Sequence, residues 1–93
     1  MTLPENAIAQ VADKLADLYM RPFGGKPKGR FRIAAKLVRQ LAGRRRLYED
    51  DVRELTRAMT ERGYVMIDMD GFFVVMSSNT FVNYRRANED CLS

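Results

Sequence analysis

The pair Asp70-Gly71 constrains the fold more than any other feature of the chain, because it separates two short runs rich in β-branched, aromatic and methionine residues. Aspartate and glycine both tolerate the positive φ angles that tight hairpin turns require. Residues 64–69 and 72–76 are therefore predicted to form two antiparallel strands that meet at this turn. Phe72 and Phe73 are adjacent in the second strand, so we expect their rings on opposite faces of the hairpin.

Three helices are predicted before the hairpin. Apolar residues recur at helical spacing up to about residue 20, over about residues 30–42 and over about residues 49–62. Gly43 and Gly63 follow the second and third of these segments, and glycine is the residue that most often ends a helix. The second helix is expected to turn an apolar face toward the core, formed by Phe31, Ala34, Leu37, Val38 and Leu41.

The remaining segments are predicted to be irregular. Residues 21–29 combine glycine, proline and lysine, which disfavours regular structure, so we expect a basic, solvated linker. After the hairpin, a short helix near residue 80 and a flexible tail over residues 88–93 are expected. At 93 residues the chain has the length of one small domain, and we expect residues 1–93 to form it.

The segment LTRAMTERGYVMIDMDGFFVV, residues 55–75, is similar to a phrase common in winged-helix proteins. In that phrase a helix ends on Glu-Arg-Gly, an aromatic residue and a valine follow, and a hairpin turns at Asp-Gly. Together with the helix order, it makes the chain resemble a winged-helix (winged helix-turn-helix) domain over about residues 31–76, without pointing to a particular family. The resemblance implies an α+β fold, a three-helix winged-helix-like domain with a C-terminal two-stranded β-hairpin and a short tail.

Charge is distributed unevenly along the chain. Ten of the sixteen basic residues lie in residues 21–46, a stretch that contains no acid, whereas the other 67 residues carry six bases and twelve acids. The formal net charge of +4 therefore conceals a strongly basic segment beside an acidic remainder. Such a segment attracts polyanions, and nucleic acid is the simplest polyanionic partner.

Composition argues against several classes of function. The chain has no histidine and one cysteine, Cys91, so neither a zinc site nor a Ser–His or Cys–His nucleophile is available within one chain. Its carboxylates are mixed with arginines, and it has no Gly-rich phosphate-binding motif. We therefore expect no catalysis, no metal and no cofactor. Without a secretory signal or an apolar run of about 20 residues, a soluble cytoplasmic protein with no membrane partner is expected.

The predicted function is a small nucleic-acid-binding regulator, with double-stranded DNA as the favoured target. In winged-helix proteins the third helix enters the major groove and the hairpin turn contacts the backbone, so by resemblance these roles fall on residues 49–62 and on the turn at Asp70-Gly71. In this chain, however, the third helix opens with three carboxylates at residues 49–51, and the turn carries two acids and no base. Phosphates are repelled by such groups.

The second helix and its flanks are therefore expected to make the contact, mostly with phosphates. Arg53 and Arg57 are expected to reach base edges from the third helix. The candidate nucleic-acid-binding residues are Lys26, Lys28, Arg30, Arg32, Lys36, Arg39, Arg44, Arg45, Arg46, Arg53 and Arg57.

Alternatives to DNA binding are also consistent with the sequence. A protein-interaction adaptor or antiactivator would use the fold without binding DNA, and its acidic third helix and turn would meet a basic partner. RNA binding would use Phe23 and Phe31 as stacking aromatics among the cations. An exposed ring at Phe72 or Phe73 would further indicate a homodimer through the hairpin or the tail.

Overall fold

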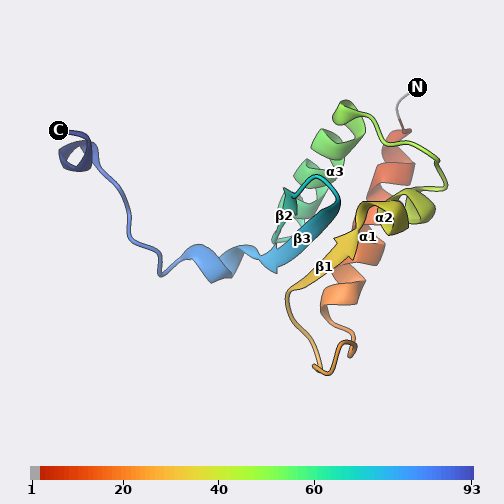
Figure 1. Ribbon diagram of the computed structural model, residues 1–93, viewed down its shortest axis with the longest axis horizontal. Helices are drawn as coiled ribbons and strands as arrows, with labels where there is room; N and C mark the ends of the chain where they lie inside the picture. The colour runs from red at the N-terminus through yellow and green to blue at the C-terminus, as the bar shows by residue number, and fades with distance from the viewer. Residues whose placement is uncertain (1–2) are drawn as a thin grey trace.

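A computed structural model describes residues 3–93 of the chain. Figure 1 shows the helices and the sheet gathered in one body, from which the residues after the last strand extend to one side. The elements are α1 (Glu5–Tyr19), β1 (Phe31–Ala34), α2 (Ala35–Ala42), α3 (Glu49–Glu61), β2 (Tyr64–Asp68), β3 (Phe72–Ser77) and the 3-10 helices η1 (Ser78–Phe81) and η2 (Glu89–Leu92).

Helices α1 and α3 form where the apolar periodicity predicts them. Each buries a stripe of apolar side chains at helical spacing, which places these side chains on one side of the helix. The buried apolar residues are Ile8, Val11, Ala12 and Leu15 in α1 and Leu55, Ala58 and Met59 in α3. Both helices lie behind the strands in Figure 1 and cover one face of the sheet, which we call the inner face.

The sheet has three strands, and this finding corrects the predicted two-stranded hairpin. β3 lies in the centre, with β1 and β2 antiparallel on its two sides. Residues 31–34, which the helical spacing assigned to the second helix, form β1. Phe31 and Ile33 are buried and alternate with exposed Arg32 and Ala34, so the true period is two. Pairing with β3 places Phe31 opposite Val75.

Helix α2 begins directly after β1 and is shorter than predicted. Its first residue, Ala35, donates its backbone N–H to the carbonyl oxygen of Gly71 at 3.0 Å. The hairpin turn thereby satisfies one of the N–H groups that a helix start leaves unpaired. The helix buries Val38, whereas Leu37, expected on the core face, is 46% exposed. As predicted, α2 ends at Gly43, which has a φ of 68°.

The core lies between the helices and the inner face of the sheet. Phe73 is buried on this face, and Phe72 lies half-buried on the opposite, outer face, as their adjacency predicts. The hairpin turn also forms at the predicted pair, with Asp70 at a positive φ of 71°. The buried sheet residues are Phe31, Ile33, Met66, Phe73 and Val75.

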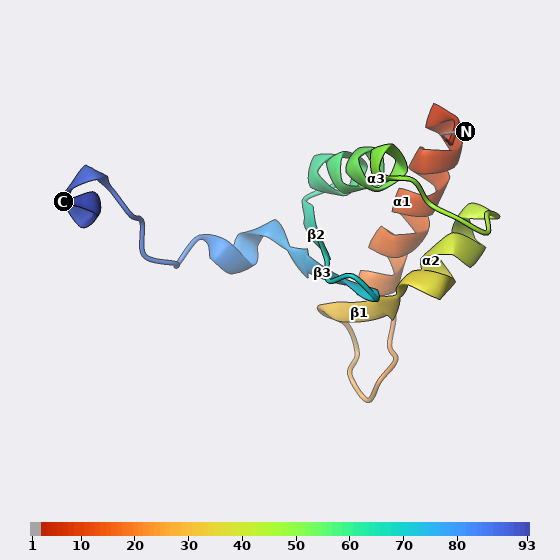
Figure 2. The same cartoon turned by 45° about the horizontal axis from the view of Figure 1, so that its top comes forward.

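Residues 20–30 form a closed loop between α1 and β1, which we call the basic loop. Phe23 and Lys26 each donate a backbone N–H to the other's carbonyl oxygen at 3.1 Å. Gly24 and Gly25 make the turn between them with φ angles of 60° and 81°, which glycine adopts without strain. The N–H of Gly29 donates to the carbonyl oxygen of Tyr19 at 2.9 Å and closes the base. Figure 2 shows this loop projecting from the body.

The chain after β3 forms an extended arm, residues 78–93, and the short helix predicted near residue 80 is present in it as the 3-10 helix η1. η1 begins where the Ser77 hydroxyl oxygen accepts the N–H of Asn79. Residues 88–93 include the exposed 3-10 helix η2. Figures 1 and 2 both show the arm leading away from the sheet.

Candidate nucleic-acid interface

The basic loop and β1 carry four of the candidate cations, all exposed. We call Lys26, Lys28, Arg30 and Arg32 the loop cluster. These side chains line one depression of about 480 Å³, together with Arg21 and without any carboxylate of residues 3–93. The Gly24-Gly25 turn and the Gly29–Tyr19 hydrogen bond hold the backbone that carries the three loop cations. The loop cluster is therefore a positively charged hollow with a defined backbone.

The two phenylalanines of this region have different environments. Phe23 is 45% exposed at the basic loop, whereas Phe31 is buried beneath it in β1. Their rings contact edge to face, with centroids 5.7 Å apart. Phe31 therefore packs in the core, and Phe23 alone offers a ring that a nucleic-acid base can reach.

Arg32 connects the loop cluster to the outer face of the sheet. Its guanidinium carbon lies 5.7 Å from the centre of the Phe72 ring, which is within the range of a cation–π contact. The contact holds the side chain over the sheet without neutralising its charge. Arg32 therefore keeps its capacity to bind an anion.

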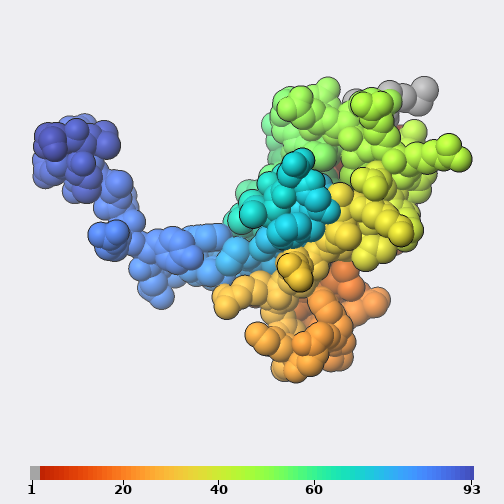
Figure 3. Space-filling view, in the orientation of Figure 1, coloured from red at the N-terminus to blue at the C-terminus, as the bar shows by residue number. Residues whose placement is uncertain are grey.

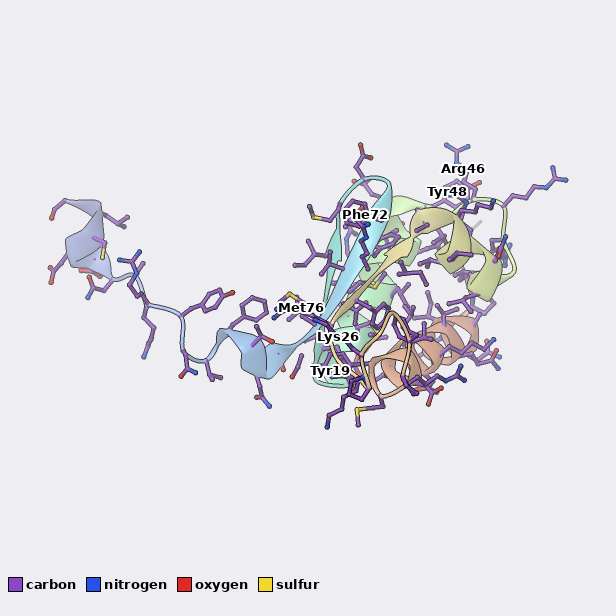
Figure 4. The ribbon with its side chains drawn as sticks, turned by 60° about the horizontal axis from the view of Figure 1, so that its bottom comes forward. Tyr19, Lys26, Arg46, Tyr48, Phe72 and Met76 are labelled. Atoms are coloured by element: carbon purple, nitrogen blue, oxygen red, sulfur yellow. The ribbon has the colours of Figure 1, made fainter. Side chains whose placement is uncertain are left out.

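The second group of cations lies along α2 and beyond its C-terminal end. We call Lys36, Arg39, Arg44, Arg45 and Arg46 the helix-end cluster. At Gly43 the chain reverses, and the N–H of Arg44 donates to the carbonyl oxygen of Arg39 at 3.0 Å. This reversal brings three arginines next to the negative end of the helix dipole, where cations are favoured. Arg46 also lies over the Tyr48 ring, 5.3 Å from its centre (Figure 4).

Carboxylates of the hairpin turn lie beside the helix-end cluster. Arg39, Arg45 and Arg46 line a depression of about 230 Å³ whose wall also contains Asp68 and Asp70. Among residues 3–93, no ion pair within 4.0 Å joins these arginines to the two aspartates. The carboxylates nevertheless lower the positive potential of the depression. The helix-end cluster is therefore less electropositive than its number of arginines indicates.

The two α3 candidates are paired with acids of the same helix. Arg53 lies 3.3 Å from Asp50, and Arg57 lies 4.0 Å from Glu54, both on the exposed surface. Exposed pairs of this kind are weak, on the order of 0.5 kcal/mol. They still offset the charge that each arginine would present to a phosphate.

One of the three carboxylates at the start of α3 is not available to any ligand. Asp51 is 3% exposed, and its two oxygens accept the backbone N–H groups of Leu3 at 2.7 Å and Tyr48 at 2.9 Å. The carboxylate thereby caps the helix and holds the N-terminal segment against it. Only Glu49 and Asp50 of this group are exposed.

Nine of the eleven candidate residues form no ion pair within residues 3–93, and Arg53 and Arg57 are the two that do. In Figure 3 the segment that carries the nine forms a band, orange to yellow, across the visible face of the body. Lys26 and Arg46 lie toward opposite ends of this body in Figure 4. The structure thus places the nine cations in two clusters that β1 and α2 connect.

Two residues near the clusters, Arg21 and Thr80, were not among the candidates. Arg21 lines the depression of the loop cluster but pairs with Asp17 at 2.8 Å. Thr80 shares a second depression, of about 230 Å³, with Lys26 and Lys28. Arg21 belongs to the acid-free stretch and was recognisable from it. The proximity of Thr80 depends on how the arm leaves the sheet, and no local pattern indicates it.

Comparison of the chain with protein-family models, with curated proteins and with solved structures finds no match. A functional conclusion therefore depends on the charges and the geometry of the molecule. Across residues 3–93, no helix combines the length and the apolar character needed to cross a membrane.

Proposed function

We propose that the protein is a nucleic-acid-binding regulator that contacts double-stranded DNA through the loop cluster and the helix-end cluster. The observation that carries the proposal is the absence of ion pairs within residues 3–93 for all nine cations of these clusters. When unpaired, solvated cations approach the phosphates, the counterions condensed on the nucleic acid are released. This release drives binding that does not depend on sequence. Contact with five or six phosphates is the expected scale of the interface.

The order of the elements supports the winged-helix resemblance as part of this proposal. Three helices precede the β2–β3 hairpin, and α3 leads directly into β2. The mode of docking in the proposal differs from the one that the resemblance implies. Glu49 and Asp50 are exposed at the start of α3, and Asp68 and Asp70 lie at the turn, so both sites repel phosphate. The basic loop and α2 are the surfaces we assign to DNA.

A protein-interaction adaptor is the second candidate function. It is favoured by the paired charges of Arg53 and Arg57, since an α3 surface of alternating sign suits a protein partner better than a polyanion. RNA is a further candidate target of the loop cluster, because the exposed ring of Phe23 lies beside these cations and could stack on a base. In each case the proposed role is binding, without a catalytic step or a cofactor, in the cytoplasm.

Titration of a labelled nonspecific duplex with the full-length protein at low salt tests the proposal, with fluorescence anisotropy as the readout. The variant Lys26→Ala/Lys28→Ala removes two unpaired cations, and Arg53→Ala/Arg57→Ala removes two paired ones, so the two variants change the net charge equally. We expect binding by the wild type, a marked loss in the first variant and a small change in the second. No binding at tens of micromolar protein would favour the adaptor.

A competition experiment separates DNA from RNA. Single-stranded RNA of the same length is added to the preformed duplex complex, and the released labelled duplex is measured. If DNA is the target, excess RNA displaces the duplex poorly. Displacement by RNA at lower concentration than by unlabelled duplex would reassign the loop cluster to RNA.

A further inference from the structure

The outer face of the sheet is apolar over β2 and β3, and no helix of residues 3–93 covers it. On β1 the same face carries Arg32, which pairs with Val74. Two cross-strand pairs, Val65 with Met76 and Ile67 with Val74, form its centre. Ile67 is 37% exposed and the others are half-buried. The face is turned toward the viewer in Figures 1 and 3, and in Figure 4 Phe72 and Met76 mark its two ends along β3.

The arm carries apolar side chains that have no place in the core. Val82 is 73% exposed, Tyr84 is 61% exposed, and Phe81 packs edge to face on Tyr84 with ring centroids 5.1 Å apart. From Thr80 onward, the arm's hydrogen bonds within the described chain join only residues 79–93. A monomer therefore exposes two apolar surfaces at once, the arm and the outer face, which is costly in water.

We propose that the arm of one copy packs on the outer face of a second copy, and that exchange of the two arms forms a homodimer. The arm's starting point favours a second copy over the arm's own sheet. Both the N–H and the hydroxyl of Ser78 donate to the carbonyl oxygen of Gly63, at 3.0 and 2.9 Å, and direct the arm away from the sheet (Figure 2). Each copy supplies one arm and one face, so a two-fold arrangement satisfies both.

The apolar parts of the two surfaces correspond. The apolar side chains of the arm, from Phe81 to Tyr84, lie together in a turn in which the N–H of Tyr84 donates to the carbonyl oxygen of Phe81 at 3.1 Å. With Phe81 to Tyr84 on the apolar pairs, Arg85 and Arg86 reach the turn end of the partner's sheet. That end carries the exposed carboxylate of Asp70 and the guanidinium of Arg32, which lies over Phe72. The arm thus has apolar residues where the face is apolar, and its cations reach an end that carries one acid and one cation.

Sedimentation equilibrium of the full chain tests the exchange, with a reductant present because Cys91 is exposed and free. Val82→Asp places a charge on the arm and Ile67→Asp places one on the outer face. Leu37→Asp, at an exposed leucine of α2 outside both surfaces, is the matched control. We expect a wild-type dimer, at least about tenfold weaker dimers for the first two variants and no change for the control. Circular dichroism checks that each variant folds.

Mixing the two weakened variants gives a result that only an exchanged dimer explains. A mixed dimer of Val82→Asp and Ile67→Asp contains one intact arm on one intact face, so the mixture should associate more strongly than either variant alone. Three results would overturn the proposal: a wild-type monomer at millimolar concentration, a dimer that both variants leave unchanged, or nuclear Overhauser contacts within a monomer between Tyr84 and its own Val74. A wild-type monomer would indicate that another protein binds the outer face. Overhauser contacts within a monomer would indicate that the chain's own arm covers it.

Discussion

The two basic clusters have similar numbers of cations but different surroundings. The loop cluster lines a hollow without a carboxylate from residues 3–93, whereas Asp68 and Asp70 line the hollow of the helix-end cluster. In the sequence, residues 21–46 carry ten bases and no acid, so nothing distinguishes the two clusters. The fold brings the acidic turn of the hairpin, more than 20 residues further along the chain, against one end of that stretch. Charge counted along a chain therefore differs from charge presented at a surface.

The largest expected effect is the loss of the loop cluster. Lys26→Ala/Lys28→Ala/Arg30→Ala removes three exposed cations that have no carboxylate beside them. At about 100 mM salt, affinity for a nonspecific duplex should fall roughly 100-fold or more, because three phosphate contacts are lost. Fluorescence anisotropy measures the change. A fall of less than about threefold would contradict the dominance of the loop cluster.

Removal of the three arginines after α2 should have a smaller effect. Arg44→Ala/Arg45→Ala/Arg46→Ala changes the net charge by the same amount as the loop variant. We expect roughly a tenfold loss of affinity, because the turn carboxylates already reduce the attraction of this cluster for phosphate. The same titration compares the two triple variants directly. Equal losses would show that the fold does not distinguish the clusters.

Neutralising the acidic turn should raise affinity. Asp68→Asn/Asp70→Asn keeps a side-chain oxygen at residue 68, which accepts the N–H of Asp70 at 2.9 Å. Asparagine also tolerates the positive φ of residue 70. We expect about a threefold gain in duplex binding. The gain should be smaller when the three arginines at 44–46 are alanine, because Arg39 is then the one cation left in the depression. An undiminished gain in the combined variant would show that the two acids act on cations outside this depression.

The smallest effect is expected for the paired arginines of α3. Arg53→Ala/Arg57→Ala removes two cations whose charge is offset by Asp50 and Glu54. Duplex affinity should change by less than about threefold, and thermal stability should change little because exposed pairs contribute weakly. A large loss of affinity would mean that the pairs open and that α3 enters the interface.

The sequence predicts the local elements of the fold well. α1, α3 and the two hairpin strands form within a residue or two of the predicted bounds. Each depends on a pattern contained in its own segment, such as helical spacing or the Asp70-Gly71 turn. β1 was missed because Phe31 and Ala34 also fit a helical stripe. The interaction that makes this segment a strand is its pairing with β3, about 40 residues away.

The candidate interface was predictable as a list of residues but not as a surface. The acid-free stretch identifies every cation of both clusters. It does not show that Phe31 is buried, that Asp51 is used to cap α3, or that the hairpin turn lies beside Arg46. Each of these facts depends on contacts between segments distant in the chain, and such contacts leave no local pattern.

The salt dependence of duplex binding tests the central claim most directly, because it counts the phosphates that unpaired cations engage. Affinity of the wild type and of the Lys26→Ala/Lys28→Ala/Arg30→Ala variant is measured from 50 to 200 mM salt. The proposed interface predicts a log–log slope of about −5 for the wild type and about −2 for the variant. A flat wild-type response, or the same slope in both proteins, would contradict a phosphate-binding surface built on the loop cluster.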